Sequence, residues 1–298
     1  MNVQKTTAAK EPLNVKKYDQ EDYILNLKSL FLSDTTDRES ALIYHDLILD
    51  HLRERQSVYS FDKEYMARQP DINKKMRSIL VDWLVDINIK FKLMPQTLFK
   101  TVNLIDRYLA IREVTKHELQ LLGITALLIQ CKYEEVYPPQ LKDFVAVCDN
   151  AYSKEEILDM ESEVLNSLEF DLNQPNSLYF LQILQYKIKM DEKPLAFVRY
   201  ILETTLLEAS IVRYNNLTQV AGAVFLVLKI FKLGNWSAEH NTIFGISEVE
   251  VRVCAKNLYI IMQKIDASSL CAIKRKFADP EFFEVSKYKI EKVNGNRQ

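Results

Sequence analysis

Side chains able to do chemistry are plentiful in this sequence, yet they form no catalytic or metal-binding motif. The chain lacks the patterns G-x-x-x-x-G-K-S/T, G-x-G-x-x-G, G-x-S-x-G and H-E-x-x-H. Glu134 and Glu135 are adjacent, so their carboxylates should point in different directions from a helix end. The 4 histidines and 4 cysteines show neither i, i+4 nor C-x-x-C spacing. We therefore expect no enzyme active site, no metal site and no cofactor.

One charged residue falls where a charge is costly. The segment MRSILVDWLVDI at 76–87 has helical periodicity, and Arg77 projects into an apolar stripe of this helix, formed by Val81, Leu84, Val85 and Phe91. A buried guanidinium without a partner costs several kcal/mol, so a carboxylate must meet it. The best candidate is Asp106, which shares an apolar stripe with Val102, Ile105 and Leu109. The sequence thus predicts a buried structural ion pair.

The same helix carries a second apolar stripe, roughly 100° away from the first on a 3.6-residue helix. Its members are Met76, Ile79, Leu80 and Trp83. Only one stripe can face the core of a single bundle. The other must meet more of the same chain or another protein.

Bulk properties exclude several classes of protein. The chain has 298 residues, of which 48% are hydrophobic, enough for two domains of modest size. With 39 basic and 41 acidic residues the net charge is −2, so we expect no nucleic acid partner. The only dense basic run, 274–276, is expected to be a solvated turn rather than a nuclear signal. No apolar run could cross a membrane and no signal peptide is present, so we expect an intracellular protein with buried, reduced thiols at Cys131, Cys148, Cys254 and Cys271.

Helical periodicity and proline punctuation predict an all-α fold. Residues 1–20 are expected to be disordered, and short and longer helices are predicted over 21–32 and 39–55. A first group of five helices is predicted near 73–91, 95–111, 116–133, 138–149 and 154–168. A second group is predicted near 176–188, 193–210, 217–231, 236–242 and 247–265. The third helix of each group is apolar nearly all round, which indicates a repeat; one continuous bundle is the alternative.

Several motifs in register resemble one family. MRSILVDWLVDI resembles the signature of the cyclin box, the helical domain that switches on cyclin-dependent kinases. QPDI at 69–72, KFKLMPQTLFKTVNLIDRYL at 90–109, LLGITALLIQCKYEEVYPP at 121–139, KDFVAVCDNAYSKEEILDME at 142–161 and FFEVSKY at 282–288 match B-type mitotic cyclins in pattern and order. The resemblance implies two five-helix cyclin boxes, with an N-terminal tail at 1–38, a helix plus first box at 39–174, a second box at 175–292 and a tail at 293–298.

The resemblance also implies a function: a non-catalytic subunit that binds and activates a mitotic cyclin-dependent serine/threonine kinase in nucleus and cytoplasm, at the G2/M transition. In cyclins, residues matching Lys132 and Glu161 form a pair that hydrogen-bonds the backbone at the kinase's regulatory helix. An adjoining apolar pocket matches Ile129, Tyr133, Leu165, Phe170 and Leu172. From the residues alone, Lys132 is a cation at a helix C-terminus and Glu161 a solvent-facing carboxylate, and the apolar side chains are core.

The second stripe of the 76–87 helix matches the family's docking patch, which receives substrate or inhibitor motifs that combine a basic residue with a spaced Leu. Met76, Ile79, Leu80 and Trp83 match its apolar floor, and Asp86 and Gln120 its polar rim, with Lys116 nearby. Burial against the N-terminal helix is the alternative. The alternatives from other classes are a transcription-factor core, which calls for a basic face and a zinc ribbon, and a scaffold without kinase binding.

Overall fold

The computed structural model describes residues 35–58 and 61–288, with side chains from residue 44 onward except at 58. The expected disorder over 1–20, the short helix over 21–32 and the tail at 293–298 lie outside the described residues. Residues 1–45 and 46–298 are separate units. The helix expected over 39–55 is α2 (Thr35–Val58), which crosses from one unit to the next.

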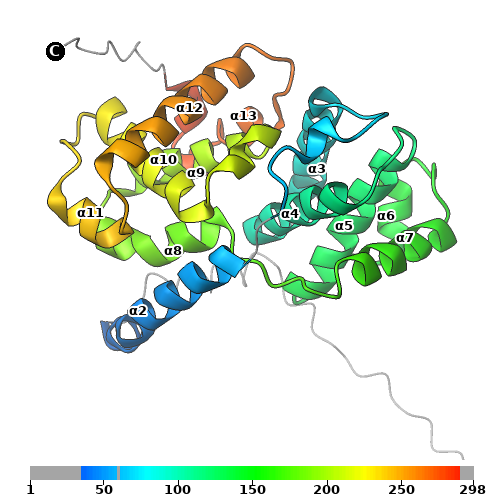
Figure 1. Cartoon of the computed structure of the whole chain (residues 1–298), viewed down its shortest axis with the longest axis horizontal. Coiled ribbons are helices and arrows are strands. Elements are labelled where there is room, and N and C mark those ends of the chain that lie inside the picture. Colours follow the sequence, from blue (N-terminus) through cyan, green and yellow to red (C-terminus); the bar gives the residue numbers. More distant parts are fainter. Residues whose placement is uncertain (1–34, 59–60, 289–298) are drawn as a thin grey trace, which may run out of the picture. The chain divides into compact units, whose positions relative to one another are not determined.

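Two successive groups of helices make up the second unit (Figure 1), and the described residues contain no strand. The first group is α3 (Lys74–Lys90), α4 (Pro95–Ile111), α5 (Glu118–Glu134), α6 (Leu141–Val147) and α7 (Lys154–Ser167). The second is α8 (Ser177–Ile188), α9 (Glu192–Thr205), α10 (Asn216–Ile230), α11 (Ala238–Phe244) and α12 (Glu248–Asp266), followed by the short α13 (Ala272–Lys276). The all-α prediction with its two groups of five is confirmed.

Local sequence explains where these helices begin. Asn73, Asn176 and Asn215 accept hydrogen bonds from the backbone of the first turns of α3, α8 and α10. Ser153 and Ser247 form capping boxes with a glutamate three residues later. Because a side-chain oxygen satisfies backbone N–H groups that have no partner in the helix, these polar residues fix each start.

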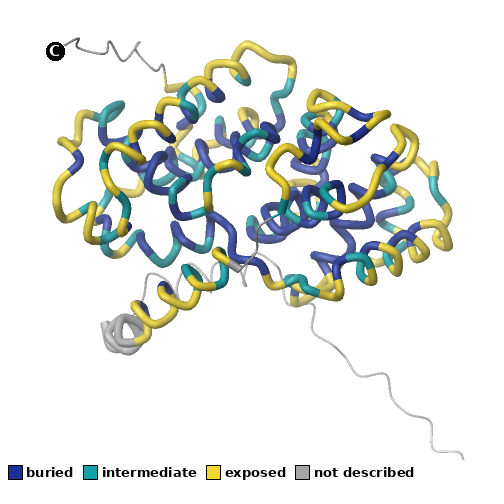
Figure 2. Tube along the Cα trace, viewed as in Figure 1, coloured by how far each residue is buried: buried dark blue, intermediate teal, exposed yellow. Residues whose placement is uncertain are grey.

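A central helix organises each group, and each contains a glycine at its closest approach. α5 packs against α3, α4, α6 and α7, and α10 packs against α8, α9, α11 and α12. A Cβ atom at Gly123 would lie 2.6 Å from Leu80 Cδ1, and one at Gly222 would lie 2.9 Å from Cys254 Sγ. Buried residues follow α4 and α5 almost continuously (Figure 2). The nearly all-round apolar patterns of the two central helices therefore reflect neighbours on every side.

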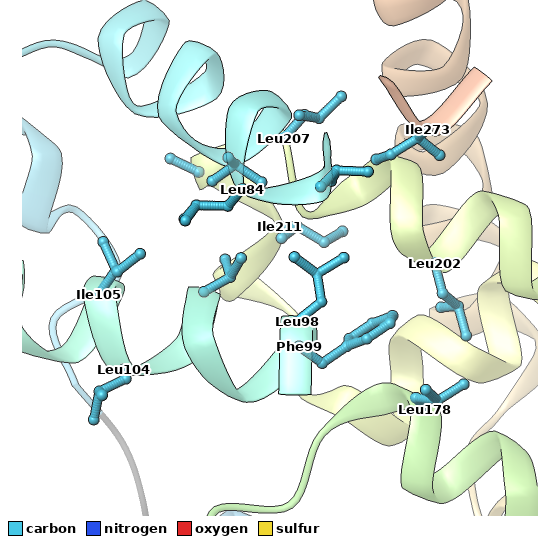
Figure 3. Packing of buried hydrophobic residues seen from close by; sticks show 14 of the residues in the cluster. Leu84, Leu98, Phe99, Leu104, Ile105, Leu178, Leu202, Leu207, Ile211 and Ile273 are labelled. Atoms are coloured by element: carbon cyan, nitrogen blue, oxygen red, sulfur yellow. The ribbon is translucent and has the colours of Figure 1, made fainter. Parts of the chain in front are cut away.

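The two groups share one hydrophobic core. Leu98 and Phe99 of α4 meet side chains from the second group, including Leu178 of α8 and Leu202 of α9 (Figure 3). All of these side chains are at most 3% exposed. The groups are thus packed against each other rather than joined by a linker alone.

Two sequence expectations are wrong in detail. The basic run 274–276 is the end of α13 rather than a turn; Lys274 and Arg275 are exposed, but Lys276 is largely covered and its Nζ is 2.6 Å from Glu203 Oε2. The helix predicted over 193–210 ends at Thr205, where Thr204 and Thr205 donate their hydroxyl protons to the carbonyls of Tyr200 and Leu202. Within the described residues, no helix is long and apolar enough to cross a membrane.

Candidate functional site

Arg77 and Asp106 form a buried bidentate ion pair between α3 and α4. Arg77 Nε lies 2.6 Å from Asp106 Oδ1, and Nη2 lies 2.7 Å from Oδ2. The Tyr65 hydroxyl donates a further hydrogen bond of 2.6 Å to Oδ1. Burial, with the charge of Asp106 beside it, raises the pKa of Tyr65. The role of this cluster is structural, since no part of it reaches solvent.

The remaining arm of Arg77 ties α3 to the second group of helices. Arg77 Nη1 donates to the backbone carbonyl of Leu206 at 2.9 Å, just after α9 ends. The neighbouring Ser78 hydroxyl donates to the carbonyl of Leu207 at 2.7 Å. Carbonyls released at the end of α9 have no helical partner, so α3 supplies one. This link was not predicted from the sequence, because backbone acceptors leave no signature in residue types.

Lys132 and Glu161 meet on the surface of the first group. Lys132 Nζ, in the last turn of α5, is 2.7 Å from both carboxylate oxygens of Glu161 in α7. The Lys132 side chain is half exposed, whereas that of Glu161 is largely covered. Both groups keep hydrogen-bonding capacity toward solvent: an ammonium has three donors and a carboxylate about four acceptor sites. The pair can therefore bind a further polar group, such as peptide backbone, without separating.

Two aromatic side chains matched to the apolar pocket are exposed. Tyr133, next to Lys132, is 48% exposed, and Phe170, in the turn after α7, is 64% exposed. Leu165 and Leu172 are half-buried, and Ile129 lies in the core. Exposed aromatic rings beside a fixed charge pair are typical of protein-binding surfaces. Of the five residues matched to the apolar pocket, Tyr133 and Phe170 are thus presented most fully to a partner.

Hydrogen bonds stabilise the turn that carries Phe170. Phe170 has a positive φ of 57°, and its backbone N–H donates to the Leu165 carbonyl at 2.9 Å. Arg107 of α4 donates to the Asp171 carbonyl at 2.6 Å, and Gln174 donates to the Asp171 carboxylate at 3.0 Å. A left-handed backbone conformation is unfavourable for a bulky residue such as Phe170. These hydrogen bonds stabilise the turn in which the exposed ring lies.

The Tyr133 ring also contacts a buried charged residue, Lys100, which was not predicted from the sequence. Lys100 of α4 is 3% exposed and ion-paired with Glu134, and its Nζ lies 4.7 Å from the centre of the Tyr133 ring. The Tyr179 hydroxyl donates to the other oxygen of Glu134 at 3.0 Å. Glu135 instead accepts from the Met94 N–H and the Thr97 hydroxyl. The expected divergence of the two adjacent carboxylates is confirmed: Glu134 binds side chains of α4 and α8, and Glu135 binds the start of α4.

A groove of about 260 Å³ lies between α3 and α5, at the second stripe of α3. It is lined by Met76, Ile79, Leu80, Trp83, Lys116, Leu119 and Gln120. The four apolar residues of the stripe are not equivalent: Ile79 is 50% exposed, whereas Leu80 is 5% exposed and packs against Gly123 of α5. Leu80 is therefore part of the core beneath the groove, and Ile79 forms its accessible wall.

Only part of the predicted polar rim lines the groove. Gln120 and Lys116 line the groove, but Asp86 is not among the lining residues. Its carboxylate is bound by Arg275 of α13, whose Nη2 lies 2.6 Å from Oδ1 and 2.8 Å from Oδ2. One turn earlier, Asp82 accepts a hydrogen bond of 3.0 Å from the Ala272 backbone N–H. The acidic face of α3 is thus engaged by α13.

The chemistry available at these surfaces is recognition. Within the part of the chain that the structure describes, no group of three or more His, Cys, Asp or Glu residues is arranged to hold a metal ion. Burial raises the pKa of the Cys148 thiol to about 11 and that of Cys254 to about 12, so neither is a nucleophile at neutral pH. Apolar side chains with charged residues around them are typical of surfaces that bind other proteins.

Residues 47–173 match the family described as "Cyclin, N-terminal domain", and residues 175–291 match "Cyclin, C-terminal domain". Similar proteins include a G2/mitotic-specific cyclin-B of Hydra vulgaris, with 39% identity over 75% of this chain and 62% of the relative. Another is the G2/mitotic-specific cyclin-B2 of Bos taurus, with 35% identity over 85% of this chain and 65% of the relative. The chain therefore spans less than two thirds of the length of these relatives.

Two solved structures share the fold. A viral cyclin from herpesvirus saimiri superposes with a TM-score of 0.63 at 20% identity, covering 72% of this chain and 97% of that chain. The yeast RNA polymerase II CTD kinase complex CTDK-1 contains a chain with a TM-score of 0.57 at 15% identity, covering 75% of this chain and 74% of that chain.

Proposed function

The chain belongs to the cyclin family, and on that premise we propose that it is the regulatory subunit of a mitotic cyclin-dependent serine/threonine kinase. Catalysis belongs to the kinase, and this subunit acts by binding, in nucleus and cytoplasm, at the G2/M transition. The names of its relatives, G2/mitotic-specific cyclins B, support the mitotic assignment.

The observation that carries the proposal is the Lys132–Glu161 pair, with Tyr133 exposed next to Lys132 and Phe170 exposed in the turn after α7. The pair would hydrogen-bond backbone groups at the kinase's regulatory helix, and the two rings would cover apolar side chains of that helix. Held inward, the helix places its glutamate against the lysine that orients ATP phosphates. Activation then follows from differential affinity, because this surface must bind the active arrangement of the kinase better than the inactive one.

We further propose that the groove between α3 and α5 recruits substrates or inhibitors that carry a basic-x-Leu motif. Ile79, Met76 and Trp83 offer apolar surface to the leucine, and Gln120 offers an amide to the motif's backbone. The groove and the Lys132–Glu161 pair lie on different parts of α5, so one chain can bind both kinase and substrate.

The experiment exchanges the two charges of the pair. Lys132→Glu combined with Glu161→Lys can retain an ion pair but reverses the charges presented to a partner, so the melting temperature should stay nearly constant. Co-purification of a cyclin-dependent kinase and activation of that kinase on a simple peptide should both be lost. The matched control exchanges Arg252 and Glu248, another exposed ion pair, on α12.

Three results are distinguishable. Loss of kinase binding in the 132/161 exchange alone supports the proposal. Normal activation by that variant would refute this binding surface. Failure of the unaltered chain to bind any cyclin-dependent kinase would favour a scaffold instead.

A further inference from the structure

Asp86 is the only acidic residue among those matched to the docking patch of α3 and α5. It lies seven residues after Ile79, so it occupies the same side of α3 two turns further on. Asp82, one turn earlier than Asp86, is committed to the backbone of α13. Lys116, on the opposite wall, is cationic and would repel a basic group. In the docking role proposed above, selection for a basic residue therefore depends on Asp86.

That carboxylate already has a partner within the chain. One nitrogen of the Arg275 guanidinium, Nη2, lies 2.6 and 2.8 Å from its two oxygens. A basic residue of a docking motif would have to share Asp86 with Arg275 or displace it. We infer that Arg275 is an internal competitor that weakens the preference of this groove for a basic residue in its ligand; the inference rests on the docking role proposed above.

The backbone of α13 holds Arg275 close to Asp86. On one side, Lys276 is ion-paired with the buried Glu203, and Ile273 and Phe277 are at most 2% exposed. On the other, the Ala272 N–H is bonded to Asp82. Only the Arg275 side chain is free to move, so the guanidinium stays at a high effective concentration beside the carboxylate. A ligand in solution must overcome this advantage.

The pair itself contributes little to folding. The side chains of Arg275 and Asp86 are 60% and 47% exposed, and exposed ion pairs contribute little because solvent screens them and ordering the side chains costs entropy. Arg275 can therefore be replaced without loss of the fold, while the anchors of α13 remain. This separation of docking from stability makes the inference testable by substitution.

The test compares two labelled peptides by fluorescence polarisation, one with Arg-x-Leu and one with citrulline in place of the arginine. Citrulline keeps the shape of arginine and removes its charge. Against Arg275→Met and Arg275→Gln, the Arg-x-Leu peptide should bind about two- to fivefold more tightly than to the unaltered chain, the range of one exposed ion pair. The citrulline peptide should bind all three proteins equally. Arg252→Met, which removes an exposed arginine paired on α12, should change neither affinity.

The outcomes separate this inference from the docking proposal. Equal affinity of Arg-x-Leu for the unaltered chain and both Arg275 variants overturns the competition and leaves docking standing. Equal tightening of both peptides also overturns it, because charge would then not be the cause. If neither peptide binds the unaltered chain or the variants, docking and competition fail together.

Discussion

At the scale of single residues, Arg77 uses all three nitrogens of its guanidinium in hydrogen bonds. Its three nitrogens are each given to a different acceptor: the two oxygens of Asp106 and the carbonyl of Leu206. Burial alone would lower the pKa of Arg77, but Asp106 raises it. The guanidinium is therefore charged inside the core, and its burial there depends on the ion pair with Asp106.

Arg77→Ala should lower the free energy of unfolding by about 3–5 kcal/mol, because it leaves Asp106 as a buried charge with only Tyr65 as donor. Replacing both Arg77 and Asp106 by apolar residues of similar volume should cost less. Urea unfolding monitored by circular dichroism measures both. Arg213→Ala is the control, since Arg213 pairs with Glu64 at the surface and its loss should cost less than about 1 kcal/mol. Similar values for Arg77→Ala and Arg213→Ala would contradict a buried pair.

At the scale of elements, α3 shows what its own sequence determines and what it does not. Two apolar stripes and a charge in one of them are visible in residues 76–87 because helical periodicity is local. The burial of Leu80 is not, because it depends on Gly123 in α5, which leaves room for the leucine side chain. The role of Asp86 depends in the same way on Arg275, almost two hundred residues later.

The same limit applies to the basic run of α13. A stretch of three cations suggests exposure, and only the three-dimensional structure brings Glu203 of α9 to Lys276. Burial alone would raise the pKa of Glu203, but Lys276 and Arg199 lower it below its usual value. Helix order and the central apolar helices were predictable, since each is encoded in one segment; contacts between distant polar residues were not.

Substitutions at the neighbouring positions Ile79 and Leu80 of α3 should therefore separate an effect on docking from an effect on folding. Leu80→Ala should destabilise the chain by about 2–5 kcal/mol, as for a buried leucine. Ile79→Ala should have a small effect on stability, because half of this side chain is exposed, and should weaken binding of a basic-x-Leu peptide. Thermal unfolding and peptide titration on the two variants measure this. Collapse of the Ile79→Ala variant, or its normal peptide affinity, would remove Ile79 from the docking surface.

At the scale of the whole second unit, the two boxes share a core and backbone-directed bonds. Arg77 and Ser78 bond to the carbonyls that follow α9, and Asp82 bonds to the start of α13. Leu98 and Phe99 reach side chains of the second box (Figure 3). Breaking the second box would expose these apolar groups and leave the guanidinium of Arg77 without one acceptor. The boxes should consequently unfold as one cooperative unit rather than as two independent domains.

Leu258→Ala, a substitution in α12 of the second box, tests this cooperativity. Leu258 is fully buried in α12, and its Cδ1 lies 3.0 Å from a Cβ position at Gly222, so truncation should open a cavity and cost about 2–5 kcal/mol. If the boxes are coupled, amide hydrogen exchange should accelerate in α3, at Leu84 and Val85, as much as in α10. Each 1.4 kcal/mol of lost stability corresponds to about a tenfold faster exchange through global unfolding.

Val249→Ala on the same helix is the control, because Val249 is 73% exposed and its truncation should leave both helices protected. Faster exchange in α10 with unchanged α3, together with two melting transitions, would mean that each box holds its fold alone and that the bonds from α3 only orient them.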